Sequence, residues 1–352
     1  MKKKTIGMYG GKFLPFPHLG HVYSMTAAAS MADELHVIIS HDSDYERKLC
    51  EGGCAEHVSF TLRLRWWKQL TRELPHVHVH EIYDEQTGSF SDWENGAKKI
   101  RAAIGSPIDF VFSSEPDYGP IFSRLYPEAE HILIDPERKR YPVSGTMFRK
   151  DGVLKHWDMV PKCVRPHFVK KVVIAGTESC GKSTLAANMA QLYNTSFVKE
   201  YGRTFYEELG GCEGITVPED YPHIAYAHKL EEWKQLKLAD KILFVDTEAI
   251  TTQFFSHAYL NKRQPVLDEM ARLQEYDLWL LLEPDVDWVD DGTRSFGDQD
   301  LRWKNHLLLK SLLDEHHVSY KIIKGSYRER LEKSIRFTDE LLKENDKAER
   351  AS

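Results

Sequence analysis

The chain has 352 residues, an ordinary globular composition and a formal net charge of −7. This length exceeds one ordinary hydrophobic core and predicts two domains. The negative charge argues against a general attraction to nucleic acid or to an anionic membrane. No apolar run approaches the roughly 18 residues that span a bilayer, and the N-terminus lacks an apolar signal segment, so we expect a cytoplasmic protein without membrane insertion.

The first half of the chain alternates strand-like and helix-like patterns. Short apolar runs at residues 5–9, 35–39, 77–82, 110–113 and 132–135 predict strands, and the periodic segments between them predict helices. This β-α-β alternation predicts a parallel sheet, whose ligands bind at the carboxyl ends of the strands.

The first candidate site follows the first predicted strand. The strand ends in the run Gly10-Gly11-Lys12-Phe13, and His18-Leu19-Gly20-His21 stands at the start of the next helix. Two imidazoles that flank a glycine can donate hydrogen bonds to one phosphate while the backbone comes close. The alternative is a pair of surface histidines in a proline-rich turn.

A second polar cluster follows the last predicted strand of this half. Ser144 and Thr146 lie at an expected helix start, and Arg149 follows about one turn later. Hydroxyls and N–H groups at a helix N-terminus, together with an arginine, can bind a polyphosphate. An ordinary capped helix is the alternative interpretation.

Residues 151–171 contain prolines and charges but no long periodic run. This composition predicts a domain at residues 1–155, a linker at 156–170 and a second domain at 171–352.

The second domain opens with a phosphate-binding loop. The run from Gly176 to Ser183 satisfies G-x-x-x-x-G-K-[ST], follows a predicted strand at 172–175 and precedes a predicted helix. Converging backbone N–H groups, the helix N-terminus and the lysine would hold the phosphates of ATP. The residues expected to do so are Gly176, Glu178, Ser179, Gly181, Lys182, Ser183 and Thr184.

Two carboxylates end later strands of the same domain. Glu200 follows a predicted strand at 196–199, and Asp246 ends an apolar strand at 242–245 in the manner of a Walker B acid. Both are expected on the phosphate side of the sheet, where Asp246 and Ser183 would hold Mg²⁺. For Asp246 the alternative is a helix N-cap.

An acidic, glycine-punctuated loop follows the predicted strand at 278–282. It carries Arg294, and Arg302 lies on the next helix. The loop is similar to the lid of small-molecule kinases, in which an arginine closes over the transferred phosphoryl group. A solvated loop whose acids balance its arginines is the alternative.

These motifs together carry a family resemblance. His18-Leu19-Gly20-His21 with Ser144-x-Thr146-x-x-Arg149 resembles the paired signatures of the nucleotidylyltransferase superfamily, and a phosphate-loop kinase follows. The whole chain, from about residue 5 to 340, resembles the bifunctional nicotinamide-nucleotide adenylyltransferases and ribosylnicotinamide kinases of the NadR type. Further matching segments are Arg63–Trp66, Phe112–Glu115, Asp135–Arg138, Glu200–Arg203 and Trp288–Ser295.

The resemblance implies an α/β fold with an N-terminal Rossmann-like nucleotidylyltransferase domain and a C-terminal P-loop kinase domain. It implies that the kinase converts nicotinamide riboside and ATP to nicotinamide mononucleotide (NMN), and that the first domain joins NMN to ATP to give NAD and pyrophosphate, with Mg²⁺. A homo-oligomer is compatible with the resemblance. We expect no nucleic-acid partner, since the chain starts directly at the first strand without a helix-turn-helix segment.

Residue roles also follow from the resemblance. Glu200, Tyr201 and Arg203 would bind the riboside, with Glu200 either a base or a hydrogen-bond partner of its hydroxyls. Trp93 would stack on the pyridinium ring, although a core position on its helix is an equal alternative. The residues expected to hold ATP in the first domain are Gly10, Gly11, Lys12, Phe13, His18, His21, Ser144, Thr146 and Arg149. The expected catalytic residues are His18, His21, Lys182, Glu200, Asp246 and Arg294.

One spacing departs from the family pattern. Five steps separate Phe13 from His18, whereas the family's G-x-F-x-P-x-H-x-G-H has four, so either Lys12 or Phe13 takes the place of the family phenylalanine.

Two other functions use the same parts. One is a phosphopantetheine adenylyltransferase fused to a dephospho-coenzyme A kinase, and the other is a regulator that senses nucleotides without turning them over. The segments Trp288–Ser295 and Glu200–Arg203 favour NAD synthesis over the coenzyme A alternative.

Overall fold

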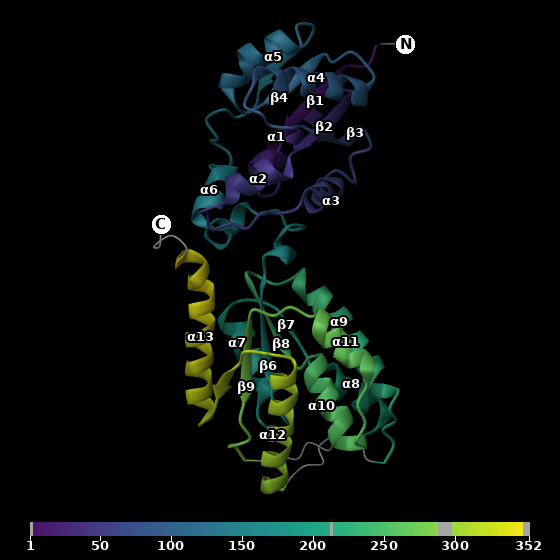
Figure 1. Ribbon diagram of the computed structural model, residues 1–352, viewed down its shortest axis with the longest axis vertical. Helices are drawn as coiled ribbons and strands as arrows, with labels where there is room; N and C mark the ends of the chain where they lie inside the picture. The colour runs from purple at the N-terminus through teal and green to yellow at the C-terminus, as the bar shows by residue number, and fades with distance from the viewer. Residues whose placement is uncertain (1–2, 212–213, 288–297, 348–352) are drawn as a thin grey trace. The chain divides into compact units, whose positions relative to one another are not determined.

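The computed structural model describes residues 3–211, 214–287 and 298–347. The chain forms two compact units, each built on one five-stranded parallel sheet (Figure 1). The second unit is Pro166–Glu344, and the described residues before it and after it group with the first. The two parallel sheets confirm the predicted α/β fold class. Arg294 of the predicted loop lies outside the described residues.

The first unit has the strand order β3-β2-β1-β4-β5. Its strands are β1 (Ile6–Gly11), β2 (Glu34–His41), β3 (Val77–Tyr83), β4 (Phe110–Ser113) and β5 (Glu130–Leu133). Its α-helices are α1 (Leu19–Ala29), α2 (Ser43–Cys50), α3 (Phe60–Leu70), α4 (Phe90–Ile104), α5 (Gly119–Leu125) and α6 (Gly145–Asp151). Because β1 is central and the order reverses beside it, its carboxyl end lies at the switch point where such sheets bind ligands.

Helices cover both faces of this sheet. On one face Met25 of α1 and Trp67 of α3 are buried against the strands. On the other face Ala97 of α4 and Tyr126, which follows α5, are buried in a second cluster. Burial on both faces explains why the central strands are continuous apolar runs rather than alternating ones.

The last strand of this unit lies two residues earlier than the sequence predicts. β5 ends at Leu133, and Asp135 adopts a left-handed backbone with φ 48°. Its carboxylate accepts hydrogen bonds from the N–H groups of Lys139 at 2.8 Å and Arg140 at 3.0 Å. Aspartate tolerates this conformation and ties down its own following turn, which ends the strand.

The second unit has the strand order β10-β9-β6-β8-β7. Its strands are β6 (Lys170–Ala175), β7 (Phe197–Val198), β8 (Ile242–Asp246), β9 (Leu278–Leu282) and β10 (Lys321–Ile323). Its α-helices are α7 (Lys182–Leu192), α8 (Tyr201–Leu209), α9 (Asp220–Leu236), α10 (Ala249–Leu260), α11 (Pro265–Leu273), α12 (Gln299–Glu315) and α13 (Tyr327–Lys347). β6 is central, so the phosphate-binding loop also emerges at the middle of a sheet.

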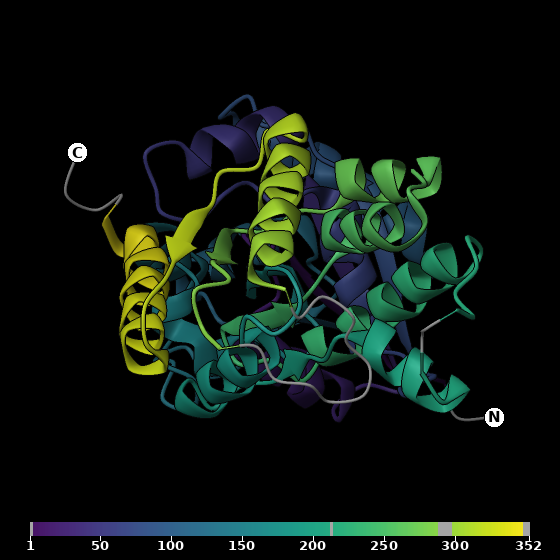
Figure 2. The same ribbon diagram turned by 90° about the horizontal axis from the view of Figure 1, so that it is seen from below.

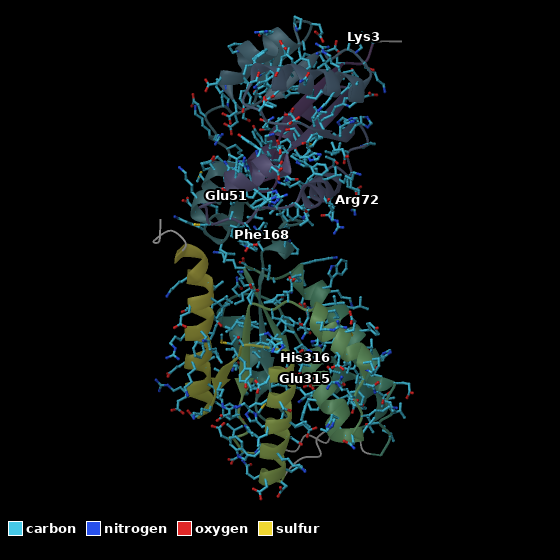
Figure 3. The ribbon with its side chains drawn as sticks, in the orientation of Figure 1. Lys3, Glu51, Arg72, Phe168, Glu315 and His316 are labelled. Carbon is cyan, nitrogen blue, oxygen red and sulfur yellow. The ribbon has the colours of Figure 1, made fainter. Side chains whose placement is uncertain are left out.

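Helices α7 and α13 lie on one side of this second sheet, and α8 to α11 lie on the other (Figures 1 and 2). Helix α12 ends at Glu315, next to His316 (Figure 3), and contacts α10. Within the described part of the chain, no helix combines the length and the apolar character needed to cross a bilayer.

Candidate active sites

The first unit has a pocket at the carboxyl ends of β1 and β4, between the N-termini of α1 and α6. The pocket wall includes every residue that the sequence predicts for ATP binding in this domain. These are Gly10, Gly11, Lys12, Phe13, His18, His21, Ser144, Thr146 and Arg149.

His18 and His21 cap helix α1 reciprocally. The Nδ1 atom of His18 accepts the backbone N–H of His21 at 3.4 Å, and the Nδ1 atom of His21 accepts the backbone N–H of His18 at 3.4 Å. The two rings stack with centroids 3.6 Å apart. Because each Nδ1 accepts a hydrogen bond, each neutral ring carries its own proton on Nε2, which can donate a hydrogen bond to a ligand.

Burial keeps both histidines neutral. Burial, with a smaller effect of the Arg138 guanidinium, lowers the pKa of His18 to about 3. Burial, the neighbouring His18 and Arg138 hold the pKa of His21 well below its ordinary value. Among the described residues, the His18 Nε2 atom is buried without a hydrogen-bond partner, so it is available to an anion.

The turn after β1 is fixed from beneath by a buried ion pair. Arg63 of α3 donates to the Lys12 carbonyl and to the Glu46 carboxylate, and both side chains of this pair are fully buried. Phe13 packs edge-on against His21 and Trp67, with centroids 5.0 and 4.7 Å away. The Lys12 Nζ is also buried, and burial lowers its pKa. Phe13 therefore supports the histidines by packing, while Lys12 supplies charge.

The N-terminus of α6 forms the opposite wall. Ser144 is the N-cap and accepts the Met147 N–H at 3.3 Å, while Arg149 donates to the Thr146 hydroxyl at 3.0 Å. A Cβ atom on Gly145 would lie 2.1 Å from the Leu14 carbonyl oxygen. Only glycine allows this helix end to approach the turn after β1.

Further residues line this pocket without having been assigned a role from sequence. They include Ser113 and Ser114 at the end of β4, and Glu115, which pairs with Arg138 at 2.5 Å. Glu115 and Arg138 lie in segments that match the family, and this match is the sequence signal that could have identified them as pocket residues. Trp93 of α4 packs edge-on against Tyr118, a pocket residue, at 5.4 Å, and does not itself line the pocket.

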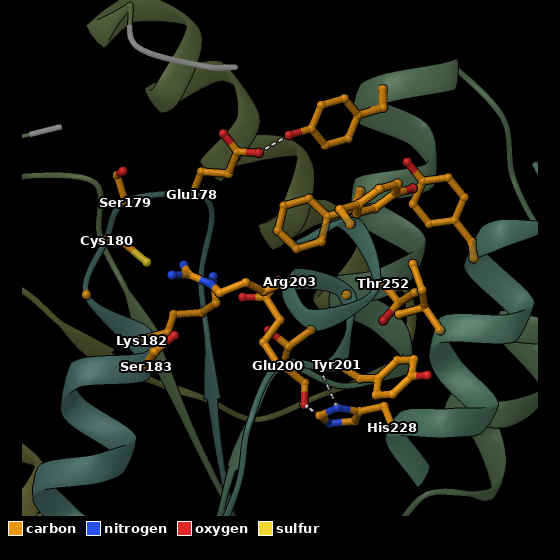
Figure 4. Close-up of a pocket in the computed structure, with 18 residues that line it drawn as sticks. Glu178, Ser179, Cys180, Lys182, Ser183, Glu200, Tyr201, Arg203, His228 and Thr252 are labelled. Carbon is orange, nitrogen blue, oxygen red and sulfur yellow. Dashed lines mark hydrogen bonds between the residues drawn. The ribbon is translucent and has the colours of Figure 1, made fainter. Parts of the chain in front are cut away.

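The pocket of the second unit lies beside the phosphate-binding loop. Figure 4 shows Lys182 and Ser183 on one side of it and Tyr201, His228 and Thr252 on the other. The predicted residues in its wall are Glu178, Ser179, Gly181, Lys182, Ser183, Glu200, Tyr201 and Arg203. Gly176 and the exposed Thr184 do not line the pocket.

Lys182 is buried at the start of α7. Its Nζ donates to the Thr177 carbonyl at 3.1 Å and lies 5.7 Å from the Phe255 ring. Burial opposes the charged form, but carboxylates led by Glu200 outweigh it and raise the pKa of Lys182. The ammonium is therefore charged at the loop. The Cys180 thiol is buried and donates to the Thr177 carbonyl, and burial raises its pKa, so it is not poised to react.

Asp246 at the end of β8 is fully buried beneath the loop. Burial and the nearby Glu200 raise its pKa to about 6, and a hydrogen bond from Ser183 partly offsets this rise. Among the described residues its Oδ2 atom has no hydrogen-bond partner. No group of three or more histidine, cysteine or acidic side chains in the described chain could hold a metal by itself. One carboxylate and one hydroxyl suit a cation that takes its remaining ligands from phosphates and water.

The far wall of this pocket is aromatic, and of its aromatic residues the sequence predicted only Tyr201. His228 holds Tyr201 of this wall in place. The Nδ1 atom of His228 accepts the Tyr201 N–H at 3.4 Å, and its Nε2 atom lies 2.9 Å from the Thr247 carbonyl oxygen. Burial lowers the pKa of His228, in keeping with a neutral ring. The aromatic residues are Tyr201, Tyr206, Tyr221, Phe255 and Tyr259. They come from α8, α9 and α10, and apart from Tyr201 none lies in a segment that the sequence motifs singled out.

Comparisons with known proteins cover both units. The sequence model of a family described as an AAA domain matches residues 171–330. Over 350 residues the chain is 33% identical to the trifunctional NAD biosynthesis/regulator protein NadR of Escherichia coli (strain K12), covering 97% of this chain and 85% of that protein. It is 32% identical to the protein of the same name from Salmonella typhimurium, with the same coverage.

Two crystal structures of NadR proteins have a similar fold. One is a complex with NR, with a TM-score of 0.77, 21% identity, and coverage of 98% of this chain and 97% of that chain. The other is a complex with NAD and AMP-PNP, with a TM-score of 0.78, 20% identity, and coverage of 98% and 96%. At these identities the likeness is one of fold, and it extends over both units.

Proposed function

The chain belongs to the NadR family of NAD biosynthesis proteins, and we infer that it is a bifunctional nicotinamide-nucleotide adenylyltransferase and ribosylnicotinamide kinase. The observation that carries this inference is the presence of two separate phosphate-binding pockets, one in each unit. The product of the second pocket, a 5′-phosphate on a ribosyl pyridinium, is the nucleophile that the first pocket needs.

In the second unit the riboside 5′-hydroxyl attacks the γ-phosphorus of ATP, and ADP leaves. Lys182 and the N–H groups of the loop hold the phosphates, which is where most catalysis of phosphoryl transfer arises. Glu200, close enough to Lys182 to raise its pKa, accepts either the hydroxyl proton or a hydrogen bond from the riboside. The aromatic wall favours a flat cationic ring over a neutral aliphatic one.

In the first unit the NMN phosphate attacks the α-phosphorus of ATP, and pyrophosphate leaves. No nucleophile from the protein is required, so the pocket works by alignment and by stabilising negative charge. The Nε2–H groups of His18 and His21 donate to phosphate oxygens, and Arg149, Ser144 and Thr146 bind the departing pyrophosphate. Trp93 and Tyr118 form an aromatic pair at the edge of the pocket that would receive the pyridinium ring.

Magnesium fits the second pocket. Ser183 and the unpartnered Oδ2 of Asp246 would hold it, together with phosphate oxygens and water. When bound, Mg²⁺ neutralises charge on the β- and γ-phosphates. We place the enzyme in the cytoplasm, where ATP is supplied and where the described cysteines, all free thiols, would stay reduced.

The test is a time course with purified chain, nicotinamide riboside, ATP and Mg²⁺, analysed by chromatography. NMN should appear first and NAD afterwards. Lys182→Ala should stop the reaction at the riboside, because the loop loses its only lysine, and added NMN should restore NAD formation in that variant. The proposal fails if no NMN forms while phosphopantetheine is converted to coenzyme A.

A further inference from the structure

Two buried arginines lie against the phosphate-binding loop of the second unit. Arg302 of α12 and Arg330 of α13 are each only 2% exposed, and neither lines the pocket. The sequence places Arg302 on the helix after the predicted lid. In the structure it contacts the loop at the Ser179 carbonyl and does not line the pocket.

Arg330 joins the loop to the end of β9 and to the start of α13. It donates to the carbonyls of Cys180, Glu283 and Gly325 and forms an ion pair with Asp285. Asp285 in turn accepts the Gly325 N–H at 2.7 Å. A planar guanidinium with several fixed donors can satisfy all these acceptors at once, which an ammonium cannot.

Arg302 makes the corresponding contact one residue earlier in the loop. It donates to the Ser179 carbonyl at 3.4 Å, to the Val286 carbonyl at 2.8 Å and to the Gln299 side chain at 2.9 Å. Consecutive loop carbonyls, at residues 179 and 180, are therefore each held by an arginine from a different helix.

The direction of each of these carbonyls also fixes the direction of the N–H group that follows it in the chain. In a planar trans peptide the C=O of one residue and the N–H of the next point in opposite directions. The Arg302 contact with Ser179 therefore directs the Cys180 N–H away from Arg302. The Arg330 contact with Cys180 directs the Gly181 N–H away from Arg330. Both arginines are outside the pocket wall, whereas Cys180 and Gly181 belong to it, so we expect these two N–H groups to face the pocket.

We propose that Arg302 and Arg330 are positioning residues for nucleotide binding: by holding the carbonyls of Ser179 and Cys180, they aim two loop N–H groups at the phosphates of ATP. The left-handed backbones of Ser179 (φ 53°) and Gly181 (φ 87°) support this role, because such alternation makes N–H groups converge on an anion and costs energy unless surrounding contacts hold it. This role extends the proposed kinase function. It depends on that function only for the identity of the molecule that accepts the phosphate.

The experiment compares Arg330→Met and Arg330→Lys with the wild-type chain. ADP binding with Mg²⁺ and nicotinamide riboside binding are measured by calorimetry, and kinase and adenylyl transfer rates are measured on the same samples. Both variants should weaken ADP binding and raise the KM for ATP at least tenfold. Riboside affinity and adenylyl transfer should change less than twofold. Arg330→Lys should not restore ADP binding, since lysine keeps the positive charge but lacks the planar set of guanidinium N–H donors.

Arg336→Met is the matched control. Arg336 lies on the same helix and is largely exposed, and its contacts with Glu340 at 4.0 Å and with the Phe337 ring at 4.7 Å stay within that helix. This variant should bind ADP as the wild type does.

Two results would overturn the inference. One is wild-type ADP affinity in both Arg330 variants. The other is an equal loss of ADP and riboside binding in both variants, which would mean that Arg330 supports the whole unit rather than the loop. A wild-type chain that binds ADP but does not phosphorylate the riboside would contradict the proposed function and leave this inference standing.

Discussion

His18 links the chemistry of the first pocket to the pH dependence of stability. Its pKa is about 3 in the folded chain, against an ordinary value of about 6.5. Between these values the unfolded chain binds a proton that the folded chain does not, so the free energy of unfolding falls as the pH drops from 6.5 toward 3. From pH 8 to pH 5 we expect a loss of about 2 kcal/mol from this group alone.

Protection factors for amide exchange in β1 and α1 measure this loss in the intact chain. His18→Asn is the informative variant, because asparagine also caps helices but does not titrate. It should lose clearly less protection between pH 8 and pH 5 than the wild type. An equal loss in both chains would show that His18 is not the group responsible.

Individual site residues were predictable from sequence where the chemistry is local. Lys182 and Ser183 belong to one continuous motif, and His18 and His21 to another, so their spacing alone indicates phosphate binding. Arg330 was not predictable, because it contacts a loop residue 150 positions away in the chain. Its role depends on tertiary packing that no short motif encodes.

Helix α6 should be sensitive to a single added carbon. Gly145→Ala would place a Cβ atom 2.1 Å from the Leu14 carbonyl oxygen, so the helix end must move away from the turn after β1. We expect adenylyl transfer to fall at least tenfold, with riboside phosphorylation unchanged. Steady-state assays of the two half-reactions check this.

Gly119→Ala is the matched control, since it also alters the first residue of a helix in this unit. Its Cβ atom would lie 3.5 Å from the nearest atom, His131 Nδ1, which is an ordinary contact. If Gly145→Ala were as active as Gly119→Ala, the close approach of α6 would not matter for catalysis.

The elements that the sequence predicted well are those with strong apolar runs. β8 and β9 are buried on both faces and were placed within a residue. β10 was missed because it is three residues long, begins with Lys321 and is mostly exposed, so it lacks the pattern of a strand. β5 was displaced because Ile134 continues the apolar run, while the left-handed turn at Asp135 ends the pairing early.

Each unit of the molecule has its own sheet and its own pocket, so the two activities should be separable by mutation. Lys182→Ala should reduce riboside phosphorylation at least a hundredfold and leave adenylyl transfer within twofold, because it removes charge from one phosphate site only. His21→Ala should have the reverse effect. Separate assays of each half-reaction test this, and loss of both activities in either folded variant would refute separate sites.

The contact between Arg330 and the phosphate-binding loop also predicts an order of folding during synthesis on the ribosome. Domains generally fold as units, with the N-terminal one first. The first sheet is complete once residue 133 has emerged, whereas the loop at residues 176–183 lacks its partner until the ribosome has passed Arg330. A nascent chain stalled before that point would carry a finished sheet for adenylyl transfer and a phosphate-binding loop without its support. We therefore expect the kinase unit to mature after the first unit.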